Sequence, residues 1–96
     1  MMEHSSAMEV VDAVSRAFGI NQETIMGRGD RANTARKVAI YFCQRYAALG
    51  NEAIGELFGG IHYSTVSKVA TRVKEERNKN KELSKLMDQL NSHFKA

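Results

Sequence analysis

Hydroxyl and cationic side chains gather in one short stretch of the chain, between residues 62 and 72. Ser64 and Thr65 stand near its start, and Lys68 and Arg72 follow with a spacing of one helical turn. Short hydroxyls at the start of a helix can contact base edges or phosphates when the helix enters the major groove of DNA end-first. Cationic side chains one turn apart can follow a phosphate backbone. These residue types therefore permit noncovalent recognition of duplex DNA.

A helix with one apolar stripe is the element that must position these side chains. The sequence predicts this helix from about residue 64 to 78, because four apolar residues recur at the i, i+3, i+4 and i+7 spacing of one helix face: Val66, Val69, Ala70 and Val73. A shorter helix is predicted just upstream, with Asn51 as its cap and Ile54, Leu57 and Phe58 pointing inward. Gly59-Gly60 forces a tight reversal between the two helices. A short helix, a glycine turn and a longer helix are typical of a helix-turn-helix, and the alternative is an ordinary helical hairpin with a solvated outer face.

Four further helices complete the expected fold, since no segment shows sustained two-residue alternation. Ser6 and Glu9 form a capping box that opens a helix ended by Gly19, and Asn21 caps a short helix over 22–26. Asn33 or Thr34 caps a third helix that runs to about residue 48, where Gly50 supplies a left-handed stop. Asn80 caps a final helix that reaches Phe94. The expected fold class is all-α, a compact six-helix domain over 6–96 behind a loose leader at 1–5.

The positive charge of the chain is concentrated in its middle. The net charge is only +3, but residues 1–26 carry −3, residues 27–74 carry +5 and residues 75–96 carry +1. Arg28 and Arg31 lie in a glycine-rich loop, where an arginine can extend into a narrow minor groove. Arg36 and Lys37 lie in the first turns of the third helix, where the helix dipole disfavours cations unless a phosphate faces them. A solvated basic face is the alternative explanation of this cluster.

Composition excludes several other classes of protein. A chain of 96 residues fits one domain, and no apolar run has the length of a membrane span, so we expect a cytoplasmic, nucleoid-associated protein with no membrane partner. The sequence has no phosphate-binding G-x-x-x-x-G-K-[ST] loop, its histidines are scattered, and its one cysteine, Cys43, is expected to pack in the core. His62 beside Ser64 could form a nucleophile pair, but capping or DNA contact is the favoured role. We expect no enzyme activity, metal, cofactor or small-molecule substrate.

Three motifs resemble the carboxy-terminal DNA-binding domain of the bacterial replication initiator DnaA. They are TARKVAIYF at 34–42, IGELFGG at 54–60 and STV at 64–66, and the resemblance extends over roughly residues 7 to 94. It implies a Trp-repressor-like helix-turn-helix fold and sequence-specific binding of double-stranded DNA in chromosomal replication initiation. In that family the recognition helix enters the major groove and a basic loop enters the minor groove. By position, Arg28 matches the loop arginine, Arg36 the arginine of the third helix, and Ser64 and Thr65 two threonines that open the recognition helix.

The chain departs from the family pattern just before its recognition helix. The family has an Asp-His pair there, preceded by an arginine, whereas this chain has His62-Tyr63 preceded by Ile61. Since that pair contributes to base recognition, the resemblance does not imply the usual DnaA box as the target. Tyr63 is expected to contact DNA by stacking on a sugar or a base, and the alternative is that it shields the turn. The stretch 63–68 also resembles the DnaA-like tail of some transposases associated with repetitive palindromes. Recognition of a transposon end and a non-DNA protein-interaction domain therefore remain alternatives, and the chain could be a piece of a longer protein.

Overall fold

Six helices make up the part of the chain that the structure, a computed structural model, describes: residues 6–27, 33–47 and 49–95. They are α1 (Ala7–Phe18), α2 (Gln22–Met26), α3 (Asn33–Tyr46), α4 (Asn51–Leu57), α5 (Tyr63–Lys79) and α6 (Lys81–Lys95). The all-α prediction is confirmed. No helix within these ranges is long and apolar enough to cross a membrane.

Local capping chemistry sets most of the helix ends, as the sequence predicts. Ser6 and Glu9 form the expected capping box at the start of α1, and Gly19 ends that helix in the left-handed conformation, at φ 66°. The side chain of Asn21 accepts the Glu23 N–H at 2.7 Å and so caps α2. At the start of α6 the side chain of Asn80 accepts the Leu83 N–H at 3.1 Å. The predicted capping roles of these residues are confirmed.

The connection between α3 and α4 differs from the prediction. α3 begins at Asn33 and ends at Tyr46, so it starts and ends one to two residues earlier than predicted. Gly50 is extended, at φ −77° and ψ 167°, and precedes α4 as its N-cap instead of ending α3 in a left-handed turn. Asn51 is the first residue of α4, and its side-chain oxygen accepts a hydrogen bond from Gln44 at 3.0 Å. The side-chain amide of Asn51, which the sequence predicts as the helix cap, is therefore used in a tertiary hydrogen bond to α3.

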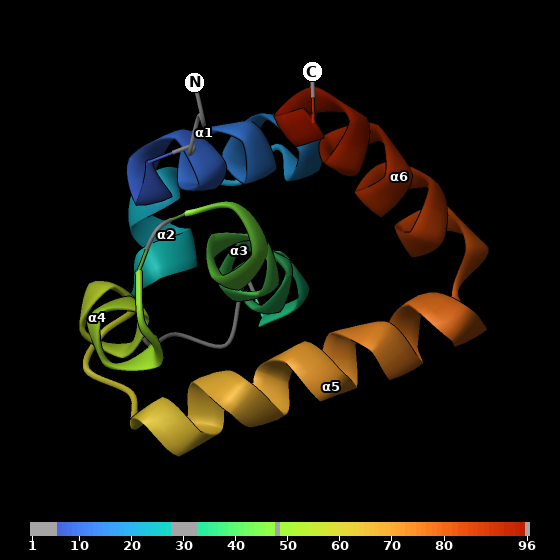
Figure 1. Ribbon diagram of the computed structural model, residues 1–96. Coiled ribbons are helices and arrows are strands. Elements are labelled where there is room, and N and C mark those ends of the chain that lie inside the picture. Colours follow the sequence, from blue (N-terminus) through green and yellow to red (C-terminus); the bar gives the residue numbers. More distant parts are fainter. Residues whose placement is uncertain (1–5, 28–32, 48, 96) are drawn as a thin grey trace.

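α3 occupies the centre of the molecule, with the other helices arranged around it (Figure 1). It packs against α1 on one side and against α5 on the other. Its predicted apolar stripe is buried at Ala35, Val38, Ala39 and Phe42, and Tyr46 is half-buried and stacked on Phe42. Cys43 is also fully buried, and desolvation raises the pKa of its thiol to about 12, which leaves the group a packing residue. This central helix is the platform on which α4 and α5 are held.

Candidate nucleic-acid interface

α4, the glycine turn and α5 form the helix-turn-helix unit that the sequence predicts. Ile54 and Phe58 of this unit are buried against the core, and so is the valine stripe of α5: Val66, Val69 and Val73. The reversal depends on Gly59 and Gly60, which have φ values of 90° and 78°. Residues with a side chain rarely adopt such φ values, so the backbone of this turn requires glycine at both positions.

Gly55 is a second requirement of the turn, which the sequence analysis did not single out. Its carbonyl oxygen accepts the N–H groups of Gly60 at 2.9 Å and Ile61 at 3.0 Å, so the turn folds tightly over it. A Cβ atom at position 55 would lie 2.2 Å from the backbone oxygen of Ile61. The only signal in the sequence is the glycine inside the IGELFGG motif, because a helical glycine often marks a close backbone approach.

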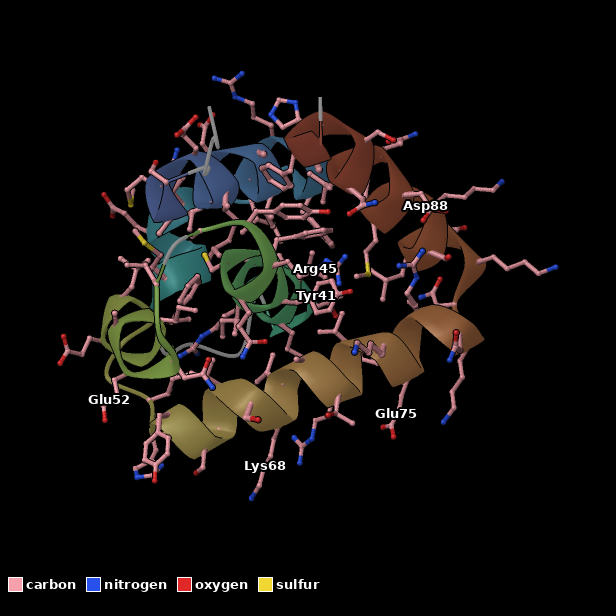
Figure 2. All side chains as sticks on the ribbon, viewed as in Figure 1. Tyr41, Arg45, Glu52, Lys68, Glu75 and Asp88 are labelled. Atoms are coloured by element: carbon pink, nitrogen blue, oxygen red, sulfur yellow. The ribbon has the colours of Figure 1, made fainter. Side chains whose placement is uncertain are left out.

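The outer face of α5, which we define as Ser64, Thr65, Lys68, Thr71 and Arg72, is exposed along its whole length. Lys68 points away from the body of the molecule (Figure 2), and α6 turns away from the amino-terminal half of α5 toward α1 (Figure 1). The side chains of Thr65, Lys68 and Arg72 have no hydrogen-bond or ion-pair partner within the described ranges. The predicted geometry, with valines inward and hydroxyls and cations outward, is therefore confirmed.

His62 caps α5, which therefore begins at Tyr63, one residue earlier than predicted. Its Nδ1 atom accepts the backbone N–H of Ser64 at 3.2 Å and lies 2.8 Å from the Ser64 hydroxyl oxygen. Within the described ranges no carboxylate bonds to His62 as the orienting acid of a nucleophile would. The geometry is that of a helix cap.

Arg36 and Lys37 both have partners inside the protein. The Arg36 guanidinium donates to the carbonyl oxygen of Phe58 at 2.6 Å, at the end of α4. The Lys37 ammonium pairs with the Glu76 carboxylate of α5 at 2.8 Å, and the Lys37 side chain is only 18% exposed. These contacts tie α3 to each helix of the helix-turn-helix. They also give a structural reason for cations at the start of α3, which the sequence analysis attributes to phosphates.

Two site predictions fall outside the part of the chain that the structure describes. Arg28 and Arg31 lie in the segment 28–32, so the basic loop remains a prediction from sequence. The described ranges contain no group of three or more His, Cys, Asp or Glu residues that could hold a metal ion. The site that the structure assembles thus consists of the outer face of α5 together with His62 and Tyr63.

This combination of fold and exposed face defines a helix-turn-helix domain. The family model described as the bacterial dnaA protein helix-turn-helix matches residues 7–73, and the chain belongs to that family. It is similar to proteins called chromosomal replication initiator protein DnaA from several bacteria. Identity is 30% to the protein of Picosynechococcus sp., over 88% of this chain and 19% of the relative. It is 31% to that of Thermodesulfovibrio yellowstonii, over 81% of this chain and 18% of the relative. The chain thus spans less than a fifth of the length of these curated relatives.

Proposed function

We propose that this domain binds double-stranded DNA sequence-specifically, with the amino-terminal half of α5 in the major groove, and that it serves chromosomal replication initiation. The proposal rests on one observation: the outer face of α5 is exposed to solvent in a helix-turn-helix that belongs to the DnaA family. The relatives, which are named replication initiators, support the biological role. The proposal includes the basic loop, with Arg28 entering the minor groove and Arg31 beside it. The domain acts by binding and not by catalysis, at the nucleoid in the cytoplasm.

The residues of the interface divide into base contacts and phosphate contacts. Thr65 has a free hydroxyl near the start of α5 and is the principal candidate for a base contact. Ser64 is also exposed, and its hydroxyl oxygen lies 2.8 Å from Nδ1 of His62, so Ser64 is a second candidate for a base contact. Lys68 and Arg72, one turn apart and without an internal partner, are assigned to phosphates.

Glu75 marks the far limit of the proposed contact. It lies two turns beyond Lys68 and projects from the same side of α5 (Figure 2). A carboxylate this exposed would repel a phosphate backbone lying along the whole helix. Contact restricted to the first three turns of α5, with the helix entering the groove end-first, avoids that repulsion.

Replacement of Lys68 by Ala should weaken binding to all DNA sequences alike. One phosphate contact is removed, so the slope of log affinity against log salt should fall by about 1. The measurement is a fluorescence-anisotropy titration of a labelled duplex at several salt concentrations. Lys85→Ala is the matched control, because Lys85 is an exposed lysine on α6 and lies off the outer face of α5. Equal slopes for both variants and the parent would refute the assignment of Lys68.

Replacement of Arg36 by Gln tests whether this residue supports the turn or holds a phosphate. We propose the first role for Arg36 and for Lys37, on the strength of their bonds to Phe58 and Glu76. The variant should lose about 1 kcal/mol of stability, which lowers the melting temperature by about 4–8 °C in a domain of this size. The salt slope of DNA binding should stay that of the parent. A slope lower by about 1 with an unchanged melting temperature would instead make Arg36 a phosphate contact.

Selection of duplexes from a random pool tests the proposed function as a whole. Sequence-specific binding predicts that one consensus is enriched, and a match to the DnaA box would support a role in initiation. A consensus typical of transposon ends would favour the second candidate, which the His62-Tyr63 departure from the family pair supports. A pool that shows no enrichment would contradict sequence-specific binding and favour the protein-interaction alternative.

A further inference from the structure

His62 and Tyr63 form a tilted aromatic pair at the start of α5. Their ring centroids are 4.4 Å apart, with the ring planes inclined by 34°. The imidazole is also held at its Nδ1 edge, where Nδ1 accepts the N–H of Ser64 at 3.2 Å and lies 2.8 Å from the Ser64 hydroxyl oxygen. A ring fixed by two hydrogen bonds is a rigid support for the phenol that lies against it.

Tyr63 is exposed to an unusual degree for a large apolar side chain. It is 51% exposed, and among the described residues only Met8 and Leu49 are comparable. Its side chain makes no hydrogen bond within those residues, and its ring contact is the one with His62. An exposed aromatic ring at the end of a helix that enters a major groove can bury its apolar surface against an apolar group there. The base edges of the major groove present one such group, the 5-methyl of thymine.

We propose that Tyr63 determines specificity by packing its ring on a thymine methyl group, and that His62 is the positioning residue that holds it in place. This inference rests on the proposed function, because it assigns a base contact within that interface. The role of His62 in this arrangement is positioning, because its Nδ1 bonds to Ser64 and one face of its ring lies against Tyr63. At the two positions where the family has an Asp-His pair, this chain would therefore recognise a base by an apolar contact of Tyr63.

The test uses thymine-to-uracil replacement, which removes only the methyl group. The probe is the duplex that selection from a random pool enriches, with each thymine replaced in turn by deoxyuridine. For the parent domain, one such replacement should weaken binding about fourfold, the equivalent of one buried methyl group. Tyr63→Ala should abolish this difference, and Tyr63→Phe should keep it, since the ring is retained.

His62 variants separate positioning from capping. Asparagine is among the best N-cap residues, so His62→Asn should keep the melting temperature of the parent while removing the aromatic support. The thymine-to-uracil difference should then fall below twofold although the domain remains folded. His62→Ala should lose both the cap and the support, with a lower melting temperature.

Three results would overturn the inference in distinguishable ways. A fourfold difference that survives in His62→Asn would remove His62 from the positioning role. A parent domain that is insensitive to every thymine-to-uracil replacement would remove Tyr63 from methyl recognition while specific DNA binding stands. An absence of any enriched duplex would overturn the proposed function itself and this inference with it.

Discussion

Replacement of Gly55 by Ala should destabilise the domain by about 3 kcal/mol, at the upper end of the usual cost of overpacking, and lower its melting temperature by more than about 12 °C. The added Cβ would lie 2.2 Å from the Ile61 carbonyl oxygen. That oxygen belongs to the turn backbone, which cannot move aside without separating α4 from α5. The sign of this stability change is informative, because replacing glycine by alanine inside a helix otherwise stabilises a protein by about 0.5–1 kcal/mol. Thermal unfolding followed by circular dichroism measures the change.

Gly50→Ala is the matched control for this substitution. A Cβ at position 50 meets no atom within 4 Å, and the φ of −77° suits any residue. Its melting temperature should stay within a few degrees of that of the parent, since only the small N-cap preference of glycine over alanine is lost. A Gly55→Ala variant as stable as Gly50→Ala would show that the close approach of the turn to α4 is not required.

Replacement of Thr65 by Ala should reduce the ratio between the affinity of the domain for its specific duplex and its affinity for random DNA. Loss of one base contact costs about 1–3 kcal/mol of discrimination, which is about 5-fold to 140-fold in the ratio of the two affinities. Thr65 is exposed, and its side chain has no partner within the described chain, so the variant should fold as the parent does. The measurement is a pair of titrations, one with the selected duplex and one with a random duplex at the same salt concentration.

Thr71→Ala controls for the loss of a hydroxyl on the same helix. Thr71 is also exposed on the outer face of α5, but it lies almost two turns further from the amino terminus. Because the first turns of a recognition helix make the base contacts, this variant should keep the ratio of specific to random affinity. Equal losses of discrimination in both variants would place α5 flat along the groove instead of end-first.

Local patterns in the sequence predict those parts of the fold that local chemistry determines. The capping box of α1 and the Asn21 and Asn80 caps involve residues at most three positions apart, and all are found as predicted. The direction of the α5 faces follows from the valine spacing alone. At the start of α4, by contrast, Asn51 accepts a hydrogen bond from Gln44 of α3. This contact depends on the tertiary fold, so N-cap preferences cannot predict it.

The partners of Arg36 and Lys37 show where prediction of the site from sequence ends. Their bonds to Phe58 and Glu76 join residues 22 and 39 positions apart, so only the folded chain brings them together. From sequence, a cation at a helix start suggests a facing phosphate, and the carbonyl and carboxylate partners that the structure shows do not appear in the local pattern. Likewise, the requirement for glycine at position 55 appears only when Ile61 is placed above it.

The account depends most directly on the outer face of α5 being a DNA-binding surface. The decisive measurement compares the parent with the double variant Lys68→Ala/Arg72→Ala in titrations of a labelled duplex between about 50 and 200 mM salt. The account predicts binding by the parent at low salt, and a slope of log affinity against log salt that is smaller by about 2 in the double variant. No binding by the parent at low salt, or equal slopes for the two proteins, would contradict it.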